Sequence, residues 1–188
     1  AAVDERCAGE SVIDNSTPSL ILVGPMGAGK STLGRHLSQI LERPFYDSDR
    51  VIEEKTGADI PWIFDVEGES GFRRREHEAI DELTAMPGIV LATGGGVVTT
   101  PENLALMHDR GCVVYLWTPV EVQLARTRND RNRPLLQTAD PQAKLEALFA
   151  ERDPLYRKVA HHVVSTASGN LKKVADDVLA CLVSRGQG

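Results

Sequence analysis

The sequence predicts an α/β fold with three layers, in which a parallel sheet lies between two layers of helices. Short apolar runs alternate with segments whose apolar residues recur at helical spacing, as is typical of strands joined by helical crossovers. The glycine-rich run at residues 24–32 supports this fold class, because it follows an apolar run and precedes a helical pattern. The candidate strands are residues 20–23, 45–46, 89–92, 113–117 and 162–165.

The composition favours a single domain and argues against two kinds of partner. The 188 residues, 41% of them hydrophobic, can bury one core but are too few for two sizeable domains. The formal charge of −6 and the lack of a basic stripe argue against binding to nucleic acid. No apolar stretch approaches the roughly 20 residues that a membrane helix needs. We expect one monomeric domain over residues 19–188 that acts on small molecules and contacts neither nucleic acid nor membrane.

Residues 1–18 are expected to form a flexible leader. They are polar and mixed in charge, without the apolar region of a signal peptide or the Arg-rich character of a transit peptide. Cys7, Cys112 and Cys181 are odd in number and lack metal-ligand spacing, which is typical of reduced thiols. The predicted location is the cytoplasm.

The run GPMGAGKST at residues 24–32 matches the phosphate-binding pattern GxxxxGK[ST] in the strand, loop and helix context that this pattern requires. Unpaired N–H groups at the start of the helix, together with the positive end of its dipole, favour phosphate. Lys30 is expected to reach the β and γ phosphates, and Ser31 to ligate Mg²⁺. The residues expected to hold the nucleotide are Gly27, Gly29, Lys30, Ser31, Thr32, Leu33 and Gly34.

Apolar stripes and prolines mark the helices between the strands. The expected core-facing stripes are Leu33, Leu37, Ile40 and Leu41 in the first helix, and Leu171, Val174, Val178 and Leu182 in the last. Pro101 and Pro119 stand where the first turn of a helix can begin, with Thr100 and Thr118 as the predicted N-caps.

The second strand run ends in FYDSD at residues 45–49. Alternation along an extended backbone places Asp47 and Asp49 on the same side, at the carboxyl edge of the sheet beside the phosphate loop. One carboxylate can hold Mg²⁺ through water, and the other can orient or deprotonate an attacking hydroxyl. The alternative is a solvated turn that caps a helix beginning near Arg50.

Residues 50–86 form a long insertion, divided by a glycine-rich break at residues 68–71, where we expect the acceptor to bind. Arg73 and Glu76 lie three residues apart and can pair on one helix face, so that the arginine becomes a pre-oriented fork for a carboxylate ligand. The alternative is a solvated basic helix face. The expected buried side of this helix consists of Phe72, Ala79, Ile80 and Leu83.

Three further segments could complete the site. The glycines at residues 94–96 follow the third strand run and would let backbone N–H groups approach an acceptor, although a plain turn is the alternative. Residues 129–140 are expected to be a flap whose Arg133 closes on the transferred phosphate. Arg157 offers a second fork, and for either arginine a solvated surface position is the alternative. The adjacent histidines at residues 161–162 lack metal-site spacing, and the tryptophans at 62 and 117 are expected in the core or in a pocket wall.

Taken together, the motifs closely resemble the shikimate kinase family. The segments GPMGAGKST, FYDSD, EEKTGADI, GFRRRE, LATGGG, NRPLL and DPLYR occur in that family's order over residues 19–185. The resemblance implies a five-stranded parallel sheet with strand order 2-3-1-4-5, a mobile lid and a substrate-binding subdomain. It also implies the reaction of shikimate with ATP to give 3-phosphoshikimate and ADP, in the biosynthesis of aromatic amino acids.

The resemblance also assigns roles to individual residues. It implies that Lys30, Asp49 and Arg133 are catalytic, with Asp49 as the candidate base and Arg133 on the transferring phosphate. It implies that Asp47 meets Mg²⁺ through water alongside Ser31, and that Arg126 lies over adenine. For the substrate, it implies that Arg73 and Arg157 grip the carboxylate, Glu76 supports Arg73, and Gly95 and Gly96 donate backbone N–H groups.

Two other functions stay open on the residues alone. Another small-molecule kinase, acting on gluconate or a nucleotide, would carry the same phosphate loop, and gluconate is also a hydroxylated acid. A nucleotide-binding module without kinase activity would use the same fold, but it would be expected to lose some of the catalytic side chains. ADP release with different acceptors separates the three.

Overall fold

The computed structural model describes residues 18–128 and 138–185. Its five strands form one parallel sheet in the order β2-β3-β1-β4-β5, which confirms the predicted fold class and strand order. The strands are β1 (Ser19–Val23), β2 (Phe45–Asp47), β3 (Val90–Ala92), β4 (Gly111–Trp117) and β5 (His162–Ser165). The expected leader at residues 1–18 lies outside the described residues except for Pro18.

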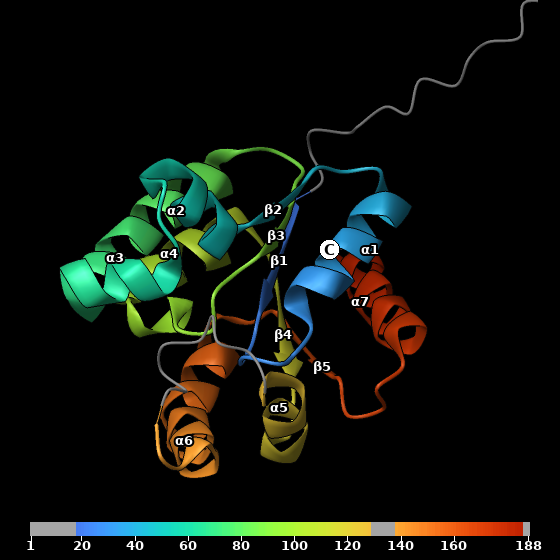
Figure 1. Ribbon diagram of the computed structural model, residues 1–188. Helices are drawn as coiled ribbons and strands as arrows, with labels where there is room; N and C mark the ends of the chain where they lie inside the picture. Colours follow the sequence, from blue (N-terminus) through green and yellow to red (C-terminus); the bar gives the residue numbers. More distant parts are fainter. Residues whose placement is uncertain (1–17, 129–137, 186–188) are drawn as a thin grey trace, which may run out of the picture.

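The helices cover both faces of the sheet (Figure 1). One face carries α1 (Lys30–Leu41) and α7 (Leu171–Arg185), and the other carries α2 (Ser48–Thr56), α3 (Ile60–Ala85), α4 (Pro101–Arg110) and part of α6 (Pro141–Val159). Helix α5 (Val120–Thr127) packs beside α6 near the carboxyl ends of the strands, and a 3-10 turn η1 (Val97–Thr99) follows β3.

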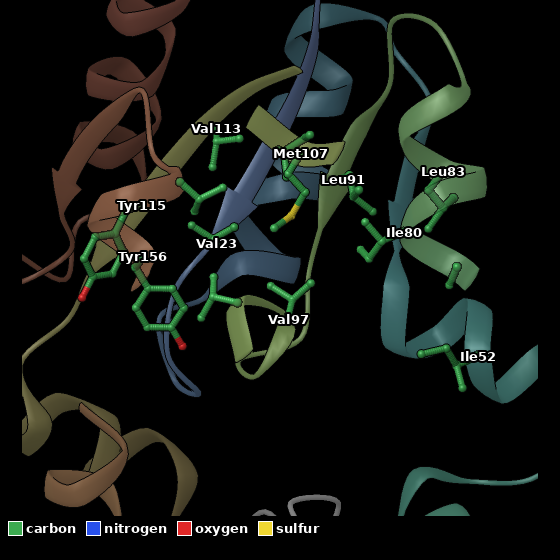
Figure 2. Packing of buried hydrophobic residues seen from close by; sticks show 14 of the residues in the cluster. Val23, Ile52, Ile80, Leu83, Leu91, Val97, Met107, Val113, Tyr115 and Tyr156 are labelled. Atoms are coloured by element: carbon green, nitrogen blue, oxygen red, sulfur yellow. The ribbon is translucent and has the colours of Figure 1, made fainter. Parts of the chain in front are cut away.

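Alternation along the buried central strand divides the core between these two faces. Ile21 and Val23 join the cluster beneath α3, α4 and α6, whereas Leu20 and Leu22 join the cluster beneath α1 and α7. The first cluster contains Tyr115 and Tyr156 as well as aliphatic side chains (Figure 2). A strand buried on both faces reads as a continuous apolar run, which is why residues 20–23 could be recognised in the sequence.

Several helix boundaries and faces differ from the expectation. Ile40 is 48% exposed and Leu171 is 41% exposed, so the outer positions of both predicted stripes lie beyond the core. Thr100 is the N-cap residue of α4, but its side chain makes no capping hydrogen bond. Helix α5 begins one residue after Pro119, while the buried Thr118 hydroxyl bonds to Leu116 and Thr166 instead of capping.

Helix α3 contains the glycine-rich break that the sequence predicts. Gly68 has φ 73° and ψ 177°, which interrupts the helix, and the expected buried side of the following segment is confirmed. Glu67 and Arg75 span this kink with two hydrogen bonds of 2.6 Å between carboxylate and guanidinium. Trp62 does not lie in the core, because it is 54% exposed, whereas Trp117 packs against the first core cluster. None of the helices within the described ranges is long and apolar enough to span a membrane.

Candidate active site

The phosphate loop joins the end of β1 to the start of α1. Gly27 and Gly29 have φ near 80°, a backbone conformation that favours glycine. A Cβ on Gly24 would lie 2.9 Å from the Leu116 carbonyl oxygen, so the loop can pass this close to β4 only with glycine there. Gly29 is the N-cap of α1 and supplies no side-chain cap, which leaves the N–H groups of the first turn for phosphate oxygens.

Lys30 and Ser31 stand in the first turn of α1. The Lys30 ammonium donates hydrogen bonds to the carbonyls of Gly24 and Pro25, at 2.6 and 2.8 Å, so it lies over the loop. The Ser31 hydroxyl donates a 2.5 Å hydrogen bond to Oδ2 of Asp47. These side chains border a cavity of about 240 Å³, lined by Gly27, Gly29, Lys30, Ser31, Thr32, Asp47, Asp49, Thr93 and Arg126.

Asp47 and Asp49 both reach this cavity, but not through strand alternation. Strand β2 ends at Asp47, which is the N-cap of α2 and accepts hydrogen bonds from the N–H groups of Asp49 and Arg50. Asp49 stands in the first turn of that helix. The two alternatives for this segment are therefore not exclusive, since one carboxylate caps the helix and also lines the cavity.

A second cavity, of about 270 Å³, continues on the other side of the loop. It is lined by Ala28, Gly29, Thr32, Leu33, Arg126, Thr166, Gly169, Asn170, Leu171 and Val174, a more apolar set that suits a nucleobase. Arg126 lines both cavities and donates a 2.7 Å hydrogen bond to the Gly27 carbonyl. Gly34 is not among the lining residues, since its α-carbon faces the Phe45 ring, 2.5 Å from where a Cβ would lie. Glycine at position 34 leaves room for the Phe45 ring to pack against α1.

The glycines after β3 lie directly under charged side chains. A Cβ on Gly94 would stand 2.7 Å from Oδ1 of Asp49 and 3.1 Å from Oε2 of Glu76. A Cβ on Gly96 would overlap the guanidinium of Arg73. Gly94 and Gly96 therefore leave no room for a Cβ, because three buried or half-buried ionic groups converge on them, so the segment is more than a plain turn.

Arg73 and Glu76 pair as their spacing predicts. Nη1 of Arg73 donates to Oε1 of Glu76 at 3.0 Å, and Nη2 donates to the exposed Glu69 at 3.3 Å. Glu76 is completely buried, and burial raises its pKa to about 7, against the opposing effect of Arg73 and with a further rise from Asp49. Within the described ranges, Oε2 of Glu76 and Nε of Arg73 are buried and make no hydrogen bond.

The second arginine of this cluster is Arg152 on α6, which the sequence interpretation missed. Its side chain is 4% exposed, and Nη1 lies 3.5 Å from the position of a Cβ on Gly95. The Tyr156 hydroxyl, one turn later, donates a hydrogen bond to the Gly95 carbonyl. The signal was available, because Arg152 interrupts a buried stripe at helical spacing that runs Leu145, Leu148, Tyr156 and Val159.

Arg157, which was expected to hold the acceptor, lies on a different face of the same helix. Its side chain is 51% exposed, pairs with Asp153 at 3.1 Å and stands over the Tyr115 ring. The structure does not bring Arg157 to Arg73, and the arginine of α6 that faces the glycines after β3 is Arg152. Arg133 and most of the expected flap at 129–140 lie outside the described residues.

Comparison with known proteins decides the family. The family model described as shikimate kinase matches residues 26–183 of this chain. The chain belongs to the shikimate kinase family. A shikimate kinase from Halorhodospira halophila is 62% identical over 88% of this chain and 94% of its own. The structure of a shikimate kinase from Acinetobacter baumannii in complex with shikimate superposes with a TM-score of 0.89 at 53% identity, covering 91% and 96% of the two chains.

A gluconokinase from Sinorhizobium meliloti shares the fold, with a TM-score of 0.59 at 16% identity over 91% of this chain and 94% of its own. This likeness concerns the fold alone. Membership of the shikimate kinase family makes this chain a kinase that uses ATP, so the interpretation as a binding module without activity is excluded. The chemistry open to the site is phosphoryl transfer, in which positioning and charge neutralisation supply most of the catalysis.

The adjacent histidines at residues 161–162 lie at the start of β5. Nδ1 of His161 accepts a hydrogen bond from the Val113 N–H at 2.9 Å, and its ring stacks on His108 with centroids 4.1 Å apart. In the part of the chain that the structure describes, no group of three or more His, Cys, Asp or Glu side chains could hold a metal ion.

Proposed function

We propose that this member of the shikimate kinase family transfers the γ-phosphoryl group of ATP to the 3-hydroxyl of shikimate, giving 3-phosphoshikimate and ADP. One observation carries the proposal: Asp49 lines the phosphate cavity and also stands against Gly94 beside the buried Glu76. A phosphate site and a site for a hydroxylated acid therefore meet at one carboxylate.

The nucleotide half of the proposal is supported by the two cavities that meet at the phosphate loop. The more apolar cavity suits adenine, and Arg126, which lines both, can lie over the base and reach the phosphates. The N–H groups at the start of α1 and the ammonium of Lys30 suit the phosphate charge.

The Ser31 hydroxyl and the Asp47 carboxylate suit Mg²⁺, because they are hard oxygen donors 2.5 Å apart beside the phosphate loop. In this assignment Ser31 ligates the ion directly and Asp47 holds it through water. The bound ion would neutralise charge on the β and γ phosphates.

The acceptor half is supported by the buried cluster. Arg73 and Arg152 can share the substrate carboxylate, because each has a buried Nε–H that makes no hydrogen bond among the described residues. The N–H groups of Gly95 and Gly96 can bind the substrate where no side chain intervenes. Asp49 is then placed to accept a hydrogen bond, or the proton, from the attacking hydroxyl. The expected contact of Arg133 with the transferring phosphate stays a prediction.

The acceptor can be tested by measuring ADP release from ATP with shikimate, gluconate, nucleoside monophosphates and no acceptor. We expect release with shikimate only, and phosphorus NMR of the product should show one monoester at the 3-position. Release with gluconate or a nucleotide in place of shikimate would contradict the proposal.

The phosphate loop can be tested with Lys30→Ala and the matched control Lys173→Ala, in which an exposed lysine of α7 is removed. We expect Lys30→Ala to lose nearly all turnover with an unchanged circular dichroism spectrum, and the control to keep wild-type turnover. Wild-type turnover in Lys30→Ala would contradict the proposed phosphate site.

The expected monomeric state also stays a prediction, and light scattering can measure it.

A further inference from the structure

The acceptor side of the site contains a buried or half-buried set of two acidic and two basic side chains. Asp49 comes from α2, Arg73 and Glu76 from α3, and Arg152 from α6, and all four lie against the glycines at 94–96 or against one another. Glu76 is completely buried, and Arg152 is 4% exposed. If both acids are ionised, the set has two negative and two positive charges and is balanced.

A substrate carboxylate that binds to the two arginines adds one negative charge to this set. A buried charge without a partner is costly, and a buried acid can remove that cost by becoming neutral. Glu76 is placed to do so, because its Oε2 is buried and accepts no hydrogen bond from any described residue. That oxygen can carry a proton without breaking the hydrogen bond that Oε1 receives from Arg73.

We propose that binding of the substrate carboxylate to Arg73 and Arg152 is coupled to the uptake of one proton by Glu76. This inference rests on the proposed function, because it takes the substrate to be a carboxylate. The proton comes from solvent and remains on Oε2 while the acid is bound. It is released when the substrate or product leaves.

The groups around Glu76 act in opposite directions, because burial and Asp49 favour its protonation whereas Arg73 and Arg152 oppose it. On its own helix it faces Arg73, from α2 it faces Asp49, and from α6 it faces Arg152 and the buried Tyr156. Burial raises the pKa of Glu76 to about 7 even with both arginines present to lower it. A substrate carboxylate would engage both guanidinium groups and add a like charge, and each effect raises the pKa of Glu76 further.

The coupling predicts how affinity depends on pH. Below about pH 7 Glu76 is already protonated, so the dissociation constant of shikimate should not change with pH. Above this value each binding event must also take up a proton, so the dissociation constant should rise by up to about tenfold per pH unit, until the pH passes the pKa of the bound state.

Isothermal titration calorimetry of shikimate binding, in buffers of low and high ionisation enthalpy, measures the protons taken up. At about pH 8 we expect uptake approaching one proton for the wild type. Glu76→Gln should show none and a dissociation constant independent of pH, because the amide imitates the protonated acid. The matched control Glu78→Gln, an exposed acid on the same helix, should keep the uptake. Infrared difference spectra of the wild type should gain the C=O band of a protonated carboxyl group on binding, which needs no variant.

The outcomes separate the two proposals. Binding without proton uptake, equal uptake in Glu76→Gln, or no new carboxyl band would overturn the coupling and leave the function intact. No binding of shikimate by the wild type would overturn the proposed function and the coupling with it. Proton uptake that is lost in Glu76→Gln and kept in Glu78→Gln establishes the coupling.

Discussion

The Ser31 hydroxyl donates a 2.5 Å hydrogen bond to Oδ2 of Asp47. The other oxygen of the same carboxylate accepts hydrogen bonds from two N–H groups at the start of α2. One side chain therefore links the first turn of α1 to the end of β2 through one oxygen and caps a helix through the other. Its capping role and its proposed role toward Mg²⁺ can be separated by substitution.

Asp47→Asn should keep the cap and lose the charge, whereas Asp47→Ala should lose both. We expect Asp47→Ala to lower the free energy of unfolding by about 1 kcal/mol relative to Asp47→Asn, since a lost N-cap costs about that much. Both variants should need more Mg²⁺ for half-maximal turnover. Thermal denaturation and turnover against Mg²⁺ concentration measure the two effects, and an unchanged Mg²⁺ requirement in Asp47→Asn would exclude the proposed role.

Arg152→Ala and Arg157→Ala form a matched pair on one helix. Loss of Arg152 should raise the KM for shikimate about tenfold or more, because a charge-assisted hydrogen bond contributes about 1.5–3 kcal/mol. The KM for ATP should change little. Arg157 is 51% exposed and pairs with Asp153, so its loss should change neither KM by more than about twofold. Steady-state kinetics measure both KM values. A larger rise of the KM for shikimate in Arg157→Ala than in Arg152→Ala would restore the role that the family resemblance gave to Arg157.

The difference between these two arginines shows what the sequence could and could not predict. The motif DPLYR identified the right helix, but it did not indicate which arginine near the motif points inward. The inward-facing arginine is decided by which face of α6 packs on the glycines after β3. These glycines lie more than fifty residues before either arginine along the chain. A charged residue within an apolar stripe at helical spacing was the local sign of a buried arginine.

The five strands were predictable for a different reason. Each contains a short apolar run, and the central strands β1, β3 and β4 are also buried on both faces, which makes residues 20–23 a continuous apolar run. The order of the strands within the sheet is not a local property of the sequence, and only the resemblance to a known family predicted it. The same limit applies to Ile40, which is 48% exposed although it continues an apolar stripe at helical spacing.

Gly68 and Gly57 test the kink within α3. Gly68 has φ 73° and ψ 177°, a region that is essentially restricted to glycine, whereas Gly57 has φ 69° and ψ 16°, which asparagine tolerates. Neither site has an atom within 4 Å of an added Cβ, so backbone strain is the main cost. We expect Gly68→Asn to lower the free energy of unfolding by about 1–3 kcal/mol and to weaken shikimate binding by displacing Arg73.

Gly57→Asn is the control and should cost clearly less, with unchanged shikimate binding. Chemical denaturation and binding titrations measure both effects. Equal losses of stability in the two variants would mean that the kink at Gly68 is not a source of strain.

The burial of Glu76 predicts how stability depends on pH, even without substrate. Its pKa rises from 4.5 to about 7 on folding, so between these pH values the folded protein keeps a proton that the unfolded chain has released. The free energy of unfolding should therefore fall as the pH rises from 4.5 to 7, by about 3 kcal/mol in total from this one group, and stay level above.

Glu76→Gln removes this titration, so the wild type should lose stability relative to the variant as the pH rises through this range. The exposed control Glu78→Gln should follow the wild type. Urea unfolding at several pH values between about 4.5 and 8 measures the difference, from which the titrations shared by both proteins cancel. Parallel curves for the wild type and Glu76→Gln would mean that folding leaves the pKa of Glu76 near its ordinary value, so that Glu76 is ionised at neutral pH. The cluster would then hold a full charge on Glu76, and Arg73 would be neutralised before any substrate arrives.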